Sequence, residues 1–96
     1  MTESRHDYID NIKTKLDKLD AKIEVLEARV DEKKGEVRRE FRATLNDVRE
    51  SRDKAKRRLE DLRAASKPAW DDVKLGVEHA WKSLSRAVDQ ASERFE

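Results

Sequence analysis

The chain contains no cysteine and is poor in glycine, proline and aromatic residues. Without a thiol, neither a disulfide framework nor a zinc site built on thiolates can form. Only 2 glycines and 1 proline occur in 96 residues, so the sequence offers few places for turns. The aromatic residues are 2 Trp, 1 Tyr and 2 Phe, which supply little bulk for a large core.

Long apolar runs are missing as well. No run of apolar residues exceeds three, whereas a helix that spans a membrane needs about twenty. The first residues, MTESRHDYID, lack the basic segment and the following apolar stretch of a secretory signal. We therefore expect a soluble protein of the cytoplasm.

Charged residues dominate what is present. They make up 47% of the chain and apolar residues only 35%, whereas a globular domain has about a quarter of its residues charged. Such a composition is typical of long helices and coiled coils, and it is also found in disordered chains. The formal charges nearly cancel, at +1, and the apolar residues are strictly periodic. Both facts favour an all-α coiled-coil fold, and the length predicts one domain, 1–96.

Charge is distributed unevenly along the chain. Residues 1–32 carry 6 basic and 9 acidic side chains, and residues 33–67 carry 13 basic and 7 acidic ones. Residues 68–96 carry 4 and 6, so a basic centre lies between two acidic arms. We expect the arms to pack against the centre, because opposite charges favour that arrangement.

The first arm has the apolar spacing of a coiled coil. Its apolar residues recur at alternating steps of three and four, which keeps one stripe toward a partner helix. β-branched residues at the a positions and leucine at the d positions favour a dimer if the helices are parallel. In such a dimer Lys15 would face Asp20 of the second copy, and Lys22 would face Glu27.

The register of this stripe shifts near Val37, just after Gly35. One interpretation is a tight turn between two helices at Gly35, and the other is a continuous helix that tolerates a glycine at a cost of about 1 kcal/mol. No Pro, Asn or Ser accompanies Gly35, and apolar residues resume at once. We therefore expect one long helix over 4–65, beginning at a cap formed by Ser4 and Asp7.

The sequence SKP at 66–68 marks a break, because Pro68 cannot continue the preceding helix. A second, amphipathic helix is predicted over 68–95, with both tryptophans on one face and a strip of small residues through Gly76 beside them. We interpret this face as a packing surface, on which the small residues, Gly76 among them, let a neighbouring backbone approach closely. The alternative is a helix that lies on a lipid surface, which the mixed charges of its polar face do not favour.

The shorter helix is expected to fold back antiparallel on residues 38–65. That arrangement leaves the apolar stripe of residues 9–37 uncovered within one chain, so the sequence predicts self-association. A parallel dimer, an antiparallel dimer and a larger oligomeric helical bundle all stay open. The predicted packing or oligomer interface consists of Ile9, Ile12, Leu16, Leu19, Ile23, Leu26, Val30, Val37, Trp70, Val73, Val77, Trp81, Leu84, Val88 and Phe95.

Signals for chemistry are weak. The basic segment 49–58, RESRDKAKRR, is interrupted by acidic residues, so we interpret it as a solvated, salt-bridged face and do not favour nucleic-acid binding. His6 and His79 have no neighbouring ligands beyond ordinary acidic residues, and no glycine-rich phosphate loop occurs. We therefore expect no catalytic, metal or cofactor site, and we predict a protein that is not an enzyme.

The C-terminal third resembles a known signature. AWDDVKLGVEHAWKSLSRAVDQASERFE is similar to the end of a family of small bacterial coiled-coil proteins labelled stress-response proteins after a cyanobacterial member. The matching positions are Ala69, Trp70, Asp71, Val73, Lys74, Gly76, Glu78, Ala80, Trp81, Leu84, Ala87, Arg94 and Phe95, with Val73 and Val88 replacing the usual Leu and Phe. Tyr8, the heptads, Phe41 and LEDLRAAS at 59–66 extend the similarity over nearly the whole chain.

The resemblance implies a bacterial, helical protein without catalytic activity and does not specify a molecular role. We predict a self-associating scaffold or interaction protein, related to stress if the family label applies, with itself or an unknown protein as partner. The alternative prediction is a peripheral protein that binds lipid or granule surfaces through its second helix.

Overall fold

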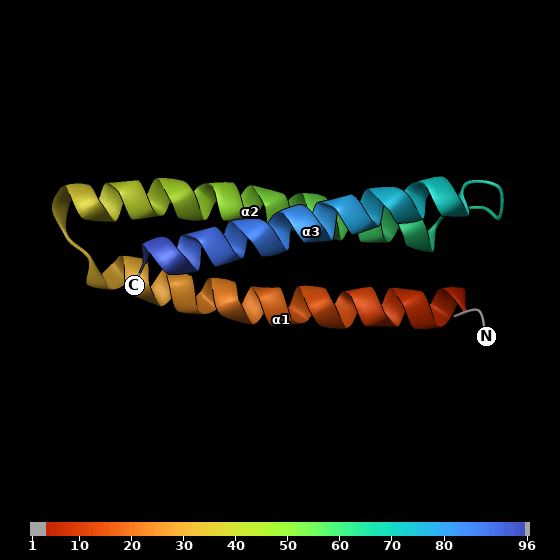
Figure 1. The fold of residues 1–96 in the computed structure, drawn as a ribbon, viewed down its shortest axis with the longest axis horizontal. Helices are drawn as coiled ribbons and strands as arrows, with labels where there is room; N and C mark the ends of the chain where they lie inside the picture. The colour runs from red at the N-terminus through yellow and green to blue at the C-terminus, as the bar shows by residue number, and fades with distance from the viewer. Residues whose placement is uncertain (1–3, 96) are drawn as a thin grey trace.

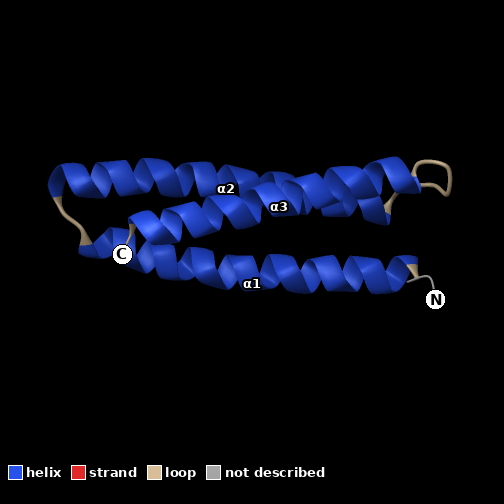
Figure 2. Cartoon of the chain, viewed as in Figure 1, coloured by secondary structure: helices blue, strands red, loops and turns tan. Residues whose placement is uncertain are grey.

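The computed structural model describes residues 4–95 and contains three α-helices (Figure 1, Figure 2). They are α1 (Arg5–Glu32), α2 (Gly35–Arg63) and α3 (Trp70–Arg94). No strand occurs within residues 4–95, so the all-α prediction is confirmed.

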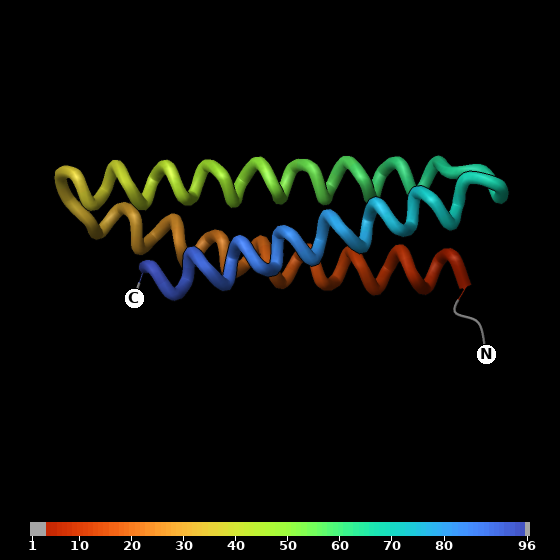
Figure 3. Tube along the Cα trace, turned by 45° about the horizontal axis from the view of Figure 1, so that its top comes forward, coloured from red at the N-terminus to blue at the C-terminus, as the bar shows by residue number. Residues whose placement is uncertain are grey.

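The helices lie side by side in an elongated bundle with extents of 51 × 20 × 16 Å. Helix α2 runs antiparallel to both of its neighbours, so α1 and α3 point in the same direction (Figure 1, Figure 3). Every pair of helices is in contact, and the α2–α3 pair has the most extensive interface. Each helix therefore covers part of the apolar surface of the other two.

The chain reverses between α1 and α2, so the prediction of one continuous helix over 4–65 is wrong. Residues 33–34 are extended, and Gly35 has a φ of +62°. This left-handed conformation suits glycine, which has no Cβ to collide with the following carbonyl oxygen. The apparent shift of register near residue 37 arises because a new helix begins at Gly35, and the heptad pattern does not continue across it.

The two remaining helix boundaries are close to the predicted ones. Ser4 is the N-cap of α1, where its Oγ accepts a hydrogen bond of 3.1 Å from the amide of Asp7. At the predicted break, helix α3 begins at Trp70, two residues later than expected. Residues 66–69 form a turn in which the amide of Ala69 donates to the carbonyl of Ser66 at 3.1 Å.

A continuous apolar core runs along the bundle axis, and no polar or charged residue of 4–95 is buried in it. Most of the predicted interface lies within it, between helices of one chain. The buried members of that prediction are Ile12, Leu16, Leu19, Ile23, Leu26, Val30, Val77, Leu84, Val88 and Phe95. The half-buried members that pack against the core are Ile9, Trp70, Val73 and Trp81.

Val37 is the exception among the predicted interface residues, since 47% of its surface is exposed. The reversal at Gly35 places Val37 in the first turn of a new helix and removes it from the α1 stripe. Helix α2 contributes its own buried residues to the core, namely Leu45, Val48, Ala55, Leu59 and Leu62. The stripe of residues 9–37 is therefore covered within one chain, which contradicts the premise from which self-association was predicted.

Aromatic pairs join the two ends of α3 to the other helices. Tyr8 of α1 meets Trp70 edge-on, with ring centroids 6.1 Å apart. At the opposite end Phe41 of α2 stacks on Phe95, with centroids 4.2 Å apart and an interplanar angle of 5°. Such pairs add roughly 0.5–1.5 kcal/mol each beyond the area that they bury, so both ends of α3 are held in place.

The predicted packing role of Gly76 is wrong. A Cβ atom at this position would meet only the Cδ of Arg58, at 3.9 Å, which is an ordinary van der Waals contact. No neighbouring backbone approaches Gly76 closely enough to require a residue without a side chain. The two glycines of the chain therefore differ, because only Gly35 needs the backbone freedom of glycine.

We predict that Gly35→Ala and Gly76→Ala shift stability in opposite directions. Gly35→Ala should lower the free energy of unfolding by about 1 kcal/mol, because alanine is strained at a φ of +62°. Gly76→Ala should raise it by about 1 kcal/mol, because alanine favours the helix and no atom obstructs its Cβ. Urea unfolding followed by circular dichroism measures both. A Gly35→Ala variant as stable as Gly76→Ala would contradict the reversal.

Candidate functional site

Ion pairs join α1 to α2 along one flank of α1. The carboxylates come from α1 and the cations from α2, as expected for an acidic arm against a basic centre. The nitrogen–oxygen distances are 2.9 Å for Lys56–Asp20, 3.1 Å for Arg49–Glu27, 3.8 Å for Arg38–Asp31 and 3.9 Å for Arg52–Asp20. Within residues 4–95 no ion pair links α3 to either neighbour, so the expected pairing of the basic centre with the second acidic arm is not found.

Over residues 15–31 the charges of α1 are sorted by sign around the helix axis. At about 100° per residue, the carboxylates of this segment fall within one arc of about 80°. These carboxylates are Asp17, Asp20, Glu24, Glu27 and Asp31. A second arc of about 80°, on nearly the opposite side, contains the cations of the segment and one valine. Between the two arcs lie the apolar residues that enter the core.

We name the second arc the basic stripe. It consists of Lys15, Lys18, Lys22, Val25 and Arg29. From first to last these residues span about 21 Å at 1.5 Å per residue. Lys18, Lys22 and Val25 are exposed, while Lys15 and Arg29 are half-buried.

The cations of the basic stripe have no anionic partner in the part of the chain that is described. No carboxylate oxygen of residues 4–95 lies within 4.0 Å of a side-chain nitrogen of Lys15, Lys18, Lys22 or Arg29. The carboxylates that sequence reasoning assigned to Lys15 and Lys22, those of Asp20 and Glu27, are engaged with α2 of the same chain. The reversal at Gly35 thus pairs three of the five carboxylates on one flank of α1 with α2, and it leaves the cations of the other flank without an ion pair in residues 4–95.

The basic stripe borders a shallow groove between α1 and α3. This groove has a volume of about 220 Å³ and is lined by Lys15, Lys18, Leu19, Lys22, Trp81 and Ser85. The Nζ of Lys15 lies 4.6 Å from the centroid of the Trp81 ring, a cation–π geometry. Trp81 is therefore half-buried beneath a cation and does not expose an open aromatic face.

Sequence reasoning missed the basic stripe because it treated Lys15 and Lys22 as interface charges of a dimer. The signal is nevertheless present in the sequence. The charges of residues 15–31, plotted at 100° per residue, separate by sign on helical periodicity alone. Only the fold could reveal which of the two charged arcs would find partners.

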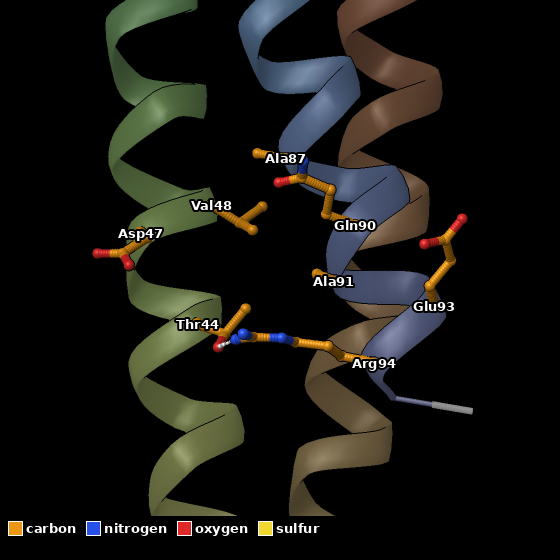
Figure 4. Close-up of a pocket in the computed structure, with 8 residues that line it drawn as sticks. All are labelled: Thr44, Asp47, Val48, Ala87, Gln90, Ala91, Glu93 and Arg94. Atoms are coloured by element: carbon orange, nitrogen blue, oxygen red, sulfur yellow. Dashed lines mark hydrogen bonds between the residues drawn. The ribbon is translucent and has the colours of Figure 1, made fainter.

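A larger groove lies between α2 and α3, where small side chains leave space (Figure 4). Its volume is about 620 Å³, and Val48, Ala87 and Ala91 contribute its apolar lining. Arg94 reaches toward α2, where its guanidinium donates to the Oγ1 of Thr44 at 3.3 Å (Figure 4). Its charged lining residues, Asp47, Glu93 and Arg94, carry both signs, so the groove presents no distinct charge to a ligand.

The remaining candidate positions behave as ordinary surface residues. His6 lies 3.3 Å from Asp10 on the exposed side of α1, and His79 is exposed on α3. No group of three or more potential metal ligands occurs within residues 4–95. The basic segment 49–58 supplies cations to the α1–α2 ion pairs, and within the segment the Nε of Arg52 lies 3.3 Å from the Oδ1 of Asp53.

Comparisons with known proteins add no assignment. Neither the protein-family models, nor the curated proteins, nor the solved structures gave a match to this chain. Among residues 4–95, none of the helices is both long and apolar enough to cross a membrane.

We predict a measurable coupling between Glu27 and Arg49. In a double-mutant cycle with alanine, their ion pair at 3.1 Å should contribute about 0.2–1 kcal/mol, because both side chains are partly exposed. The same cycle for Asp7 and Arg49 should give none, since Asp7 lies at the far end of α1. Urea unfolding at low and high salt measures both cycles. Equal coupling in the two cycles would contradict the pairing of α1 with α2.

Proposed function

We propose that this protein is a non-catalytic interaction protein that binds an anionic partner through the basic stripe of α1. The observation that carries the proposal is that the two charged arcs of α1 differ in their ion pairing with the rest of the bundle. Three of the five carboxylates of the acidic arc, Asp20, Glu27 and Asp31, pair with cations of α2 at 2.9–3.9 Å. The cations of the other arc have no carboxylate oxygen within 4.0 Å in residues 4–95. Unneutralised charge of one sign steers and binds partners of the opposite sign.

The distribution of polar groups supports binding over catalysis. Catalytic groups need a site that shields them from water and brings them together. Here the interior is filled with apolar side chains, and the charged residues lie on helix surfaces. A rigid helical body that presents a patterned surface is suited to recognition, and a cytoplasmic location in a bacterium is part of this proposal.

Membership of the stress-response family is also a proposal. It is supported by the tail signature, whose residues have structural roles in the bundle. Trp70 and Phe95 each form an aromatic pair at one end of α3, and Trp81 packs beneath Lys15 between them. A scaffold role in stress would use the same basic stripe as its contact surface.

Self-association stays a prediction, although its original premise no longer holds. Sedimentation equilibrium at micromolar concentration tests it directly. A folded species heavier than the 11.3 kDa of one chain would bear it out, and a folded species of that mass would contradict it. Repeating the measurement with Lys18→Glu/Lys22→Glu shows whether the basic stripe takes part, since two reversed charges should weaken any contact made through it.

Site-specific photo-crosslinking tests the proposed function. Val25 and Leu75 are both exposed, at 52% and 56%, and lie on different helices, so each can carry p-benzoylphenylalanine in a matched pair. In cells, the residue at position 25 should give an adduct that the Lys18→Glu/Lys22→Glu change reduces at least tenfold, which corresponds to ~1.4 kcal/mol. Position 75 should give none. Absence of any adduct at position 25, whether to protein, nucleic acid or lipid, would refute the proposal.

A further inference from the structure

We propose that the basic stripe binds the anionic surface of a lipid membrane while the three-helix bundle stays closed. This inference rests on the proposed function and names the partner of the same surface. The chain would lie along the membrane on the outer side of α1, with α2 and α3 facing away from it. It differs from the lipid binding considered from the sequence, in which the C-terminal helix had to expose its apolar face.

The first argument is charge. Lys15, Lys18, Lys22 and Arg29 lie on one side of a straight helix and have no carboxylate within 4.0 Å in residues 4–95. Four cations are enough for appreciable attraction to anionic lipid, because each Lys or Arg near such a surface strengthens binding about fivefold. The stripe runs parallel to the long axis of a 51 Å body, so all four cations can approach one plane together.

The second argument is the apolar component of the stripe. Val25 is 52% exposed in the middle of the row of cations. Trp81, half-buried at the edge of the adjoining groove, is a residue type that favours the interface between lipid and water. Lysine stems also pack along apolar surface while their ammonium groups reach the polar layer. Cations, a small exposed apolar side chain and a nearby tryptophan are the combination that a lipid headgroup layer accommodates.

Two other anionic partners fit these observations less well. Proteins that bind single-stranded nucleic acid stack bases on open aromatic rings, but Lys15 covers the ring of Trp81 at 4.6 Å. An acidic protein helix would need apolar anchors at the centre of its interface. The groove beside the stripe measures only about 220 Å³, and Val25 is the one exposed apolar residue on the stripe.

The bundle does not need to open for this binding. Tyr8–Trp70 and Phe41–Phe95 hold the ends of α3 against the other two helices. The apolar face of α3 stays buried, with Val77, Leu84 and Val88 at 1%, 0% and 0% exposure. The basic stripe is already on the surface, so contact with lipid costs no loss of core packing.

Vesicle co-sedimentation with the full chain tests the proposal. The wild-type protein should bind vesicles of phosphatidylcholine with about 30% phosphatidylglycerol and should not bind pure phosphatidylcholine. Lys18→Gln/Lys22→Gln should bind roughly 25-fold more weakly, a factor of about five for each cation removed. Binding should also fall between about 0.1 M and about 1 M salt, where the screening length drops from about 10 Å to 3 Å.

A matched control separates the stripe from overall charge. Lys54 and Arg57 are exposed on α2 without an ion pair in residues 4–95, so Lys54→Gln/Arg57→Gln makes the same change in net charge. Its binding should stay within about twofold of wild type. Circular dichroism establishes that both variants are folded. An equal loss of vesicle binding in the two variants would overturn the assignment of lipid binding to the basic stripe.

Tryptophan fluorescence tests whether the bundle stays closed. In Trp70→Phe the remaining Trp81 lies beside the stripe, and its emission should shift to the blue on phosphatidylglycerol vesicles. In Trp81→Phe the remaining Trp70, packed on Tyr8, should show no shift. An equal shift in both variants would mean that α3 detaches, which overturns the closed arrangement.

Failure of the lipid proposal is distinguishable from failure of the proposed function. If wild type does not bind the phosphatidylglycerol vesicles, the lipid assignment is wrong. A charge-dependent crosslink from position 25 to a protein or nucleic acid would then leave the proposed function standing with a different partner. Absence of both vesicle binding and crosslinks would overturn the two together.

Discussion

The left-handed backbone at Gly35 is the constraint on which the rest of the structure depends. With a φ of +62°, this residue follows the two extended residues after α1 and begins α2, which runs back alongside the first helix. The apolar stripe of residues 9–37, which one long helix would have left to a second copy, is thereby covered by α2 and α3, apart from Val37. A single backbone conformation converts an extended rod that requires a partner into a bundle that buries its own core.

The same reversal determines the electrostatics of the surface. Because α2 returns beside the acidic arc of α1, its cations reach Asp20 and Glu27 at 2.9 and 3.1 Å. The opposite arc of α1 faces outward and toward α3, whose nearest lining residues are Trp81 and Ser85. Neutral residues cannot compensate lysines, so the basic stripe keeps its charge, although the whole chain is nearly neutral at +1. The local excess of positive charge, more than the net charge of the chain, determines which partners this surface attracts.

The tryptophans show how much of the site could be predicted and why the rest could not. Their spacing correctly placed them on one face of α3, because helical periodicity depends only on sequence. Helical periodicity could not predict which residues each tryptophan would contact. Trp70 contacts Tyr8 in the first turn of α1, and Trp81 lies beneath Lys15. Both contacts join residues more than sixty positions apart. Gly76, by contrast, was assigned a close packing role that no neighbouring atom supports.

The sequence by itself determined the helical class, most of the residues of α1 and α3 that are buried and the sorting of charge around α1. These properties follow from local periodicity, since 3.6 residues per turn decide which side chains share a face. Only the tertiary structure decided which helix faces pack against each other, and therefore which charged side chains form ion pairs. Sequence reasoning judged Gly35 by its neighbours and favoured a continuous helix. The reversal is stabilised by contacts that form only after the chain has turned, between Glu27 and Arg49 and between Asp20 and Lys56. Long-range contacts of this kind leave no periodic signal, so the fold was needed to single out the basic stripe as a candidate binding surface.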